Sequence, residues 1–201
     1  MSREGLLVVV SGPSGAGKGT VINLLKQKDD NVKLSVSATT RQPRIGEIEG
    51  VNYFFKTHDQ FNDMIKGNQL VEWVKYCDNF YGTPKKYIQD TVEKGYDCIL
   101  EIEVEGALNI KENYPDCVSI FILPPSFKEL KRRIEGRGTE QSDVICKRLE
   151  KARKEIEFAD RYDYVIVNDS VENAVVGISN ILAAEKLKFT RNKGILKTLE
   201  S

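Results

Sequence analysis

Nine consecutive residues near the start of the chain have the types and spacing that bind a nucleotide phosphate. They are Gly12-Pro13-Ser14-Gly15-Ala16-Gly17-Lys18-Gly19-Thr20. The spacing matches G-x-x-x-x-G-K, between an apolar run and an apolar-periodic segment, which predicts strand, turn and helix. In that order, successive backbone N–H groups and a helix N-terminus converge on one anion. An ordinary glycine-rich turn is the alternative, but motif and context agree, so we expect Lys18 to reach the β- and γ-phosphates of a nucleoside triphosphate.

Three glutamates follow a second apolar run, at 98–100. They are Glu101, Glu103 and Glu105. The first two end a predicted buried strand, at the edge where open α/β sheets bind ligands. A carboxylate there can hold the hydration shell of phosphate-bound Mg²⁺, or it can accept hydrogen bonds from the ribose or base of a second substrate. Both roles stay open for Glu101 and Glu103, whereas Glu105 is explained by the preference of a helix's first turn for acids.

Two arginines, Arg41 and Arg44, lie in a turn rich in Ser and Thr. Their spacing would let them grip one phosphate from two sides, because a guanidinium offers bidentate donors and stays charged. Tyr53 and Tyr81 could add neutral hydroxyl donors, although packing alone would also explain each tyrosine. The turn is therefore a candidate site for the phosphate of a second substrate.

A carboxylate and a hydroxyl, those of Glu72 and Thr83, could read a base. The N1–H and the exocyclic amino group of guanine are both donors, so a carboxylate suits guanine. Adenine has no N1–H, and a buried carboxylate facing it would lose partners. The sequence therefore favours guanine over adenine as the second base.

Basic residues are dense between 128 and 153, and most of them fit solvated helix faces with acids interleaved. Arg137, between two glycines, has the position of a charge on a closing lid. Arg148 flanks an apolar stripe and could point inward toward the same phosphates. The single histidine, His58, reads as a surface residue. Phosphoryl transfer to a phosphate needs no general base, because that phosphate is already largely ionised, with a second pKa of about 6.

The elements that must position these residues follow from hydrophobic patterning. Buried strands are predicted at 6–10, 98–100, 118–123 and 164–167, alternating with helices, which implies a parallel sheet covered on both faces. The segment 35–95 differs, with shorter strands at 34–40, 51–55 and 70–76, and it looks like an inserted lobe. Thr57 with Gln60 predicts a capping box. Thr83-Pro84 predicts an N-cap followed by proline at the first helical position, and Ser126 predicts a further N-cap.

The composition of the chain limits its class and its partners. The chain has 201 residues, with 30 basic and 30 acidic side chains, so nothing in its net charge favours a nucleic-acid or membrane partner. Four scattered cysteines form no C-x-x-C pair, which fits a reduced cytoplasmic chain without structural zinc. We expect no signal peptide and no membrane-spanning segment.

Taken together, these segments resemble guanylate kinase along essentially the whole chain. Besides the phosphate loop, the matching segments are Ser37-x-Thr39-Thr40-Arg41-x-Pro43-Arg44-x-Gly46-Glu47, Tyr53-x-Phe55, Tyr81-Gly82-Thr83, Glu135-Gly136-Arg137-Gly138-Thr139 and Val165-Ile166-Val167-Asn168-Asp169. The resemblance implies a three-layer α/β fold of the P-loop nucleoside monophosphate kinases, with a parallel core sheet, an inserted GMP-binding lobe and a helical lid. Within one domain, the core would comprise 1–34, 97–125 and 160–201, the lobe 35–96 and the lid 126–159.

The resemblance also implies site residues. The catalytic residues would be Lys18, Arg41, Arg137 and Arg148. GMP would contact Ser37, Arg41, Arg44, Tyr53, Glu72, Tyr81, Thr83 and Glu101. ATP would contact residues 12–20 and, on the adenine side, Asn168, while Mg²⁺ would be held by Thr20 and Glu103 through water.

Two departures from the family pattern bear on the metal. Gly19 replaces the common serine, so direct hydroxyl coordination is open and water with Thr20 would substitute. Glu101 and Glu103 stand where aspartates are often found, which changes their reach.

The expected reaction is ATP + GMP → ADP + GDP, by a monomer or homodimer, with no nucleic-acid or membrane partner. A protein-interaction scaffold and a kinase for a ribose bisphosphate are the two rival interpretations.

Overall fold

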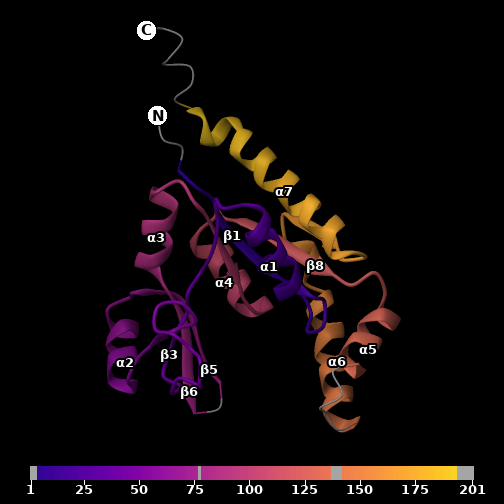
Figure 1. The fold of residues 1–201 in the computed structure, drawn as a ribbon, viewed down its shortest axis with the longest axis horizontal. Coiled ribbons are helices and arrows are strands. Elements are labelled where there is room, and N and C mark those ends of the chain that lie inside the picture. Colours follow the sequence, from indigo (N-terminus) through magenta and orange to yellow (C-terminus); the bar gives the residue numbers. More distant parts are fainter. Residues whose placement is uncertain (1–3, 77, 137–141, 194–201) are drawn as a thin grey trace, which may run out of the picture. The chain divides into compact units, whose positions relative to one another are not determined.

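The computed structural model describes residues 4–76, 78–136 and 142–193 (Figure 1). The chain forms two compact units. The first is built from the described residues of 1–11 and 30–119, and the second from those of 12–29 and 120–201. The phosphate loop at 12–20 therefore belongs to the second unit, and the turn that carries Arg41 and Arg44 belongs to the first.

A parallel sheet forms the centre of the first unit. Its strands β2 (Val32–Leu34), β7 (Asp97–Glu101) and β1 (Leu7–Ser11) lie in that order. Leu7 is in register with Cys98, and Val10 with Glu101. Residues 8–10 and 98–100 are fully buried, as expected of strands covered on both faces. Helix α4 (Val104–Asn113) contacts β1, and α3 (Lys85–Glu93) contacts β7.

A second, mixed sheet follows β2 in the chain. Its order is β4 (Phe54–Phe55), β3 (Ala38–Thr39), β6 (Asn79–Pro84) and β5 (Leu70–Tyr76). Helix α2 (His58–Lys66) carries the predicted capping box, in which the Thr57 side chain accepts from Gln60 N and the Gln60 side chain accepts from Thr57 N. Phe61 of α2 is fully buried with Ala38 and Leu70. This small core anchors the sheet that presents the predicted second-substrate residues.

The structure differs from the predictions for this region in three places. Thr83 does not cap a helix: it lies in β6, its hydroxyl donates to Glu72, and α3 begins after Pro84 without a side-chain cap. Strand β6 itself was missed because Gly82 and Pro84 disfavour strand locally. Pairing with β3 on one side and β5 on the other overrides that preference. The strand predicted at 51–55 shortens to Phe54–Phe55.

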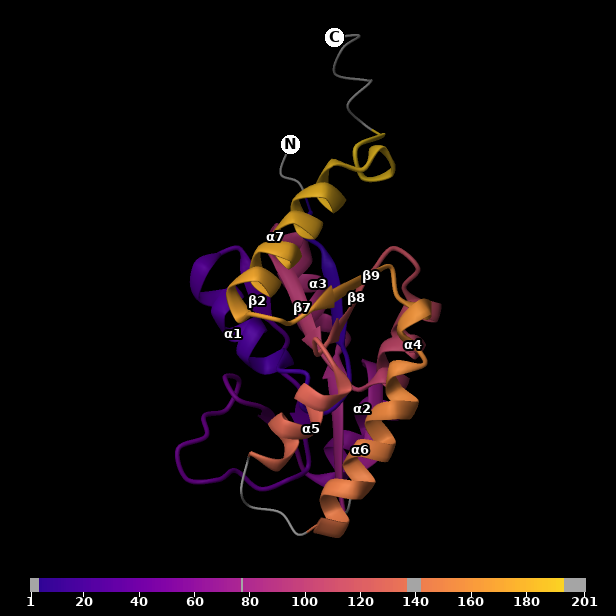
Figure 2. The same cartoon turned by 90° about the vertical axis from the view of Figure 1, so that its right-hand side faces the viewer.

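The second unit contains a parallel strand pair with helices around it. Strand β8 (Val118–Leu123), whose residues from Ile120 belong to this unit, pairs with β9 (Tyr164–Val167). Helix α1 (Lys18–Lys28) contacts α7 (Val171–Leu187). Beyond β8, α5 (Phe127–Glu135) and α6 (Ser142–Ile156) lie side by side (Figure 2). Their shared core holds Leu130, Ile134 and Ala152, and Ser126 caps α5 as predicted.

Short 3₁₀ turns follow the last two helices. Helix α6 ends at Ile156 and is followed by the 3₁₀ turn η1 (Ala159–Arg161). The last helix ends at Leu187, before the 3₁₀ turn η2 (Phe189–Arg191). Within the parts of the chain that the structure describes, no helix has the length and apolar character needed to cross a membrane.

Candidate active site

The phosphate loop has the backbone that its glycines predict. Gly17 has φ +89°, a left-handed conformation, and it caps α1, which begins at Lys18. A Cβ at Gly17 would lie 2.5 Å from the Asn168 side-chain nitrogen, so conformation and space both require glycine. The Lys18 ammonium donates to the carbonyl oxygens of Gly12, at 2.6 Å, and Pro13, at 3.3 Å. Its charge is therefore held over the loop that a phosphate would enter.

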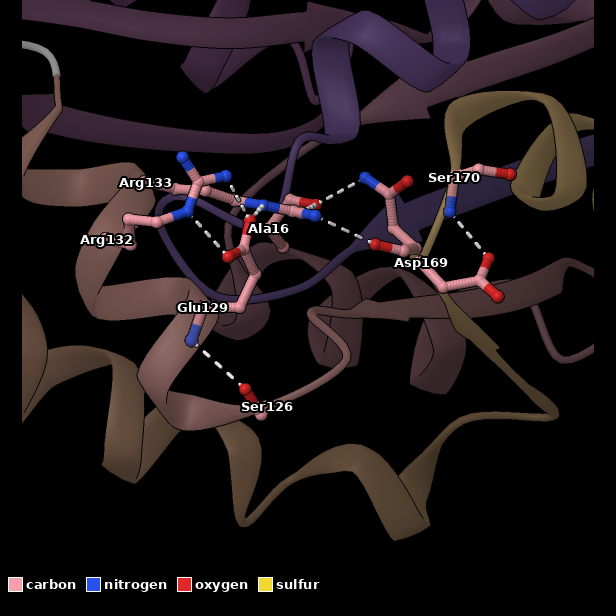
Figure 3. Close-up of polar contacts among 8 residues, drawn as sticks. Ala16, Ser126, Glu129, Arg132, Arg133, Asp169 and Ser170 are labelled. Carbon is pink, nitrogen blue, oxygen red and sulfur yellow. Dashed lines mark hydrogen bonds and ion pairs between the residues drawn. The ribbon is translucent and has the colours of Figure 1, made fainter.

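A polar network supports the loop from outside (Figure 3). Asn168, only 3% exposed, donates from Nδ2 to the carbonyl of Ala16 at 2.8 Å. Arg133 of α5 donates to the same carbonyl at 3.3 Å and to the Asn168 carbonyl at 3.1 Å. Glu129 accepts from Arg133 Nε at 2.9 Å, and Arg132 donates to both of its oxygens at 2.7 Å. The hydrogen bonds from Arg132 and Arg133 lower the pKa of Glu129 to about 2.

This network assigns a supporting function to residues that the sequence did not single out. The sequence pattern predicts a solvated helix face for Arg133 and Glu129, and their i, i+4 spacing is the local signal that pairs them. The partner of Arg133 at Ala16 lies 117 residues away in the chain. Asn168 supports the loop directly, while its predicted position on the adenine side stays a prediction.

Helix α6 brings two charged side chains to Ser14 of the loop. Arg148 donates from Nη2 to the Ser14 hydroxyl at 2.8 Å, which places this predicted catalytic arginine at the loop. The Ser14 N–H donates to the carboxylate of Glu155 at 3.3 Å, and Lys151 pairs with the other oxygen of Glu155 at 3.3 Å. Glu155 is a further residue that the sequence interpretation missed. The predicted lid arginine, Arg137, lies outside the described residues.

The predicted metal residues fall in different units. Thr20 is exposed in the first turn of α1, two residues after Lys18, and Gly19 between them has no side-chain oxygen. Glu101 ends β7 and Glu103 is the N-cap of α4, both exposed in the first unit. Among the described residues no three His, Cys, Asp or Glu side chains gather as a metal cage. This donor set fits an ion that keeps several waters and is held mainly by substrate phosphates, as Mg²⁺ is.

Glu72 and Thr83, which the sequence predicts to read a base, are hydrogen-bonded to each other. Glu72 on β5 and Thr83 on β6 stand in register, and the Thr83 hydroxyl donates to Glu72 Oε1 at 2.7 Å. Burial raises the pKa of the Glu72 carboxyl above its usual range, and the Thr83 hydrogen bond opposes that rise. Gly106 of α4 lies beside the other carboxylate oxygen, where an added Cβ would be 3.6 Å from Oε2. A partly desolvated acceptor of this kind is costly unless donors meet it.

The predicted phosphate residues of the first unit gather around Arg41. The Arg41 guanidinium lies over the Tyr53 ring, 5.3 Å from its centroid, and the Tyr53 and Tyr81 rings meet edge to face at 6.2 Å. Tyr81 and Thr83 are two residues apart on β6, so they point to the same face of the sheet. One residue predicted to bind the phosphate, Tyr81, and one predicted to read the base, Thr83, therefore share a face of the sheet.

Two other predicted residues lie at the margin of this group. Ser37 is half-buried directly before β3, where its carbonyl accepts from Phe54 N at 2.8 Å. Arg44 is exposed, and its N–H donates to the Glu47 carboxylate at 2.8 Å. Glu47 also pairs with Arg41 Nη2 at 2.8 Å, and these contacts, the Arg41 bond first, lower its pKa. From the sequence alone, Glu47 stands out only as part of the motif shared with guanylate kinase.

Comparison with known proteins gives one consistent result. The family model described as guanylate kinase matches residues 4–185. The guanylate kinase of Halalkalibacterium halodurans is 54% identical over 94% of this chain and 93% of its own length. That of Caldanaerobacter subterraneus is 49% identical over 97% and 95%. A crystal structure of guanylate kinase from Anaplasma phagocytophilum superposes with a TM-score of 0.73 at 38% identity, covering 94% of this chain and 90% of that one. The chain belongs to the guanylate kinase family.

Proposed function

We propose that the chain transfers the γ-phosphoryl group of ATP directly to the phosphate of GMP, giving ADP and GDP. The observation that carries this assignment is the Glu72–Thr83 pair, in a chain that also has the phosphate loop around Lys18. A half-buried carboxylate on a sheet face suits the two donors on the Watson–Crick edge of guanine. Membership of the guanylate kinase family supports the same reaction.

On the donor side, the main chain of the loop and the α1 N-terminus bind the ATP phosphates, and Lys18 neutralises them. Arg148, which the Ser14 hydroxyl already orients, stabilises the charge on the transferring group. Arg137 would join it, as the family resemblance implies. Arg133 and Asn168 fix the loop by binding the Ala16 carbonyl.

On the acceptor side, the chain needs to position GMP rather than activate it. Arg41 and Arg44, with the hydroxyls of Tyr53 and Tyr81, bind the GMP phosphate, whose second pKa of about 6 leaves it ionised at neutral pH. Ser37, Glu72, Thr83 and Glu101 contact the nucleoside. Because no proton must be removed, catalysis rests on orientation and charge neutralisation.

The negative charge of the two substrates explains why several cationic side chains are proposed for the site. ATP and GMP together bring roughly six negative charges, about two of them from GMP. Mg²⁺ would supply two positive charges on the ATP phosphates, with Thr20 and Glu103 holding it through water. The remaining charge, roughly four negative, would be offset by the five cationic side chains proposed here: Lys18, Arg41, Arg44, Arg137 and Arg148. We further propose that lobe and lid close on the substrates to exclude water, and that the reaction takes place in the reducing cytoplasm, where Cys98 and Cys117 stay free thiols.

A coupled assay of ADP release tests this function. GMP, AMP and a ribose bisphosphate are offered in turn as acceptors with saturating ATP and Mg²⁺. Release that depends on GMP alone supports the proposal. Release with the ribose bisphosphate instead would favour the rival kinase, and no acceptor-dependent release would favour a scaffold that binds nucleotides without turnover.

A further inference from the structure

One carboxylate ties together the two arginines of the acceptor site. Glu47 Oε1 accepts from Arg41 Nη2 at 2.8 Å, and Glu47 Oε2 accepts from the main-chain N–H of Arg44 at 2.8 Å. Each oxygen therefore has its own donor, and the two donors come from the two residues that we assign to the GMP phosphate. Among the described residues, no other acidic side chain contacts both Arg41 and Arg44.

The turn that carries Glu47 is closed by its own hydrogen bonds. The Glu47 N–H donates to the Arg44 carbonyl at 3.0 Å, so Arg44 and Glu47 bind each other in both directions. Gly46 between them has φ +89°, which a tight turn of this kind requires. The carboxylate is thus delivered to Arg41 by a backbone that folds locally, without support from a core.

Arg41 is held on more than one side. Nη1 donates to the Gln42 carbonyl at 2.8 Å, and the guanidinium plane lies over the Tyr53 ring. The Arg41 and Glu47 side chains are only 16% and 18% exposed, so water screens their pairing less than at a typical surface bridge. A free arginine side chain has about 2 kcal/mol of rotamer entropy to lose on binding a ligand. Fixing it beforehand removes part of that cost.

We propose that Glu47 is a positioning residue for the acceptor phosphate: it orients the Arg41 guanidinium and fixes the Arg44 main chain, so that both arginines are preorganised for GMP. This inference rests on the proposed function, because it assumes that the phosphate bound here is that of GMP. Glu47 itself touches no reacting atom.

Charge alone would have the opposite effect. Glu47 is negative and lies beside an anion site, so removing its charge should strengthen binding of a dianion if charge alone mattered. Preorganisation predicts weaker binding instead. The sign of the change therefore separates the two explanations.

The test compares Glu47→Gln with Glu49→Gln. Glu47→Gln turns one of the two carboxylate oxygens into an NH2 group, so the N–H donor that faces this atom loses its acceptor. Glu49 is the matched control: it lies in the same loop and carries the same charge, but its oxygens bind Phe55 N, at 2.7 Å, and Lys56, at 3.8 Å. The measurements are KM for GMP, KM for ATP, kcat, and calorimetric binding of GMP and of guanosine, which lacks the phosphate.

For Glu47→Gln we expect KM and Kd for GMP to rise roughly ten-fold, the effect of losing one hydrogen bond to a charged group. KM for ATP and guanosine binding should stay within about two-fold, and Glu49→Gln should match the parent in all of them. Unchanged or tighter GMP binding in Glu47→Gln would overturn the inference, as would an equal loss of guanosine binding.

If Glu47→Gln does not fold, Glu47→Asp replaces it in the test. Aspartate keeps the charge and both oxygens but is one methylene shorter, so we expect a smaller loss of GMP affinity. GMP affinity equal to that of the parent in Glu47→Asp would then contradict the inference. If the parent protein shows no GMP-dependent ADP release, the proposed function fails. If the parent is active and Glu47→Gln equals it, only the role of Glu47 fails.

Discussion

Two regions of this enzyme, the phosphate loop that we propose as the donor half and the Arg41–Glu47 turn that we propose as part of the acceptor half, contain the same backbone conformation in opposite surroundings. Gly17 of the phosphate loop and Gly46 of the acceptor turn both have φ +89°. A Cβ at Gly17 would lie 2.5 Å from Asn168, whereas a Cβ at Gly46 would meet nothing within 4 Å. The donor loop is therefore fixed by atoms packed around it, and the acceptor turn is fixed mainly by hydrogen bonds within itself.

The two halves also present charge differently. The donor half offers main-chain N–H groups and a helix N-terminus to a phosphate. Arg133 and Asn168 hold this loop by donating hydrogen bonds to the Ala16 carbonyl. The acceptor half offers side chains, of which Arg41 and Glu72 are the most constrained. A main-chain site recognises phosphate regardless of the nucleoside attached, whereas a side-chain site can select one base. This difference suits a common donor and a specific acceptor.

The largest effect should come from the donor lysine. We expect Lys18→Met to lower kcat about a thousand-fold, because an ammonium that stabilises developing phosphate charge is lost. Calorimetry should show GMP binding to the acceptor half within two-fold of the parent. A comparable loss of GMP affinity would mean that the halves do not bind their substrates independently.

Substitutions at Gly17 and Gly46 test whether packing fixes the donor loop more firmly than the acceptor turn. Gly17→Ala should lower the free energy of unfolding by about 3 kcal/mol, from left-handed strain and the clash with Asn168. Gly46→Ala, with the same φ and open space, should lose only about 1 kcal/mol. Urea denaturation of both variants gives the two values. Equal losses would show that packing around the donor loop adds nothing to its rigidity.

The donor loop could be predicted from sequence because its signal is local. Glycine spacing, the preceding strand and the following helix all lie within a few residues, as do the capping box at Thr57 and the cap at Ser126. Long apolar strands were also predictable, and β5, β8 and β9 have the predicted bounds. Local chemistry and local structure agree in these segments.

The supports of both sites could not be predicted in the same way. Arg133 meets Ala16 across 117 residues, and Glu155 meets Ser14 across 141. No local pattern encodes either partner. The sequence singled out Glu72 and Thr83 together, and the structure joins them by a hydrogen bond, but the strand that aligns them was not predicted. Pairing on both sides of β6 decides its structure against the preferences of Gly82 and Pro84.

Substitution of the Glu72 carboxylate tests whether the acceptor half alone selects the base. Glu72→Gln should weaken GMP binding roughly a hundred-fold, because the amide cannot accept from both the N1–H and the exocyclic amino group of guanine. KM for ATP should not change. Steady-state kinetics with GMP and AMP measure the loss of preference. A parallel rise in KM for ATP would indicate that Glu72 is structural.

The smallest effect is a pH-dependent difference in stability between Glu72→Gln and the parent. Burial raises the folded-state pKa of Glu72 above its ordinary 4.5, so the folded state binds this proton more readily than the unfolded state does. The carboxylate therefore costs stability once the pH exceeds both pKa values, and that cost disappears below the unfolded value. Glutamine still accepts from the Thr83 hydroxyl but carries no charge.

We accordingly expect Glu72→Gln to have a slightly higher Tm than the parent at neutral pH, with the difference vanishing as the pH falls through the raised pKa of Glu72. Thermal unfolding of both proteins in parallel measures this difference, and every other titrating group cancels between them. A difference that is constant with pH would mean that packing, not the buried charge, separates the two proteins. A lower Tm for the variant at neutral pH would show that the ionised carboxylate stabilises the acceptor half, and that Glu72 is kept for the fold as well as for guanine.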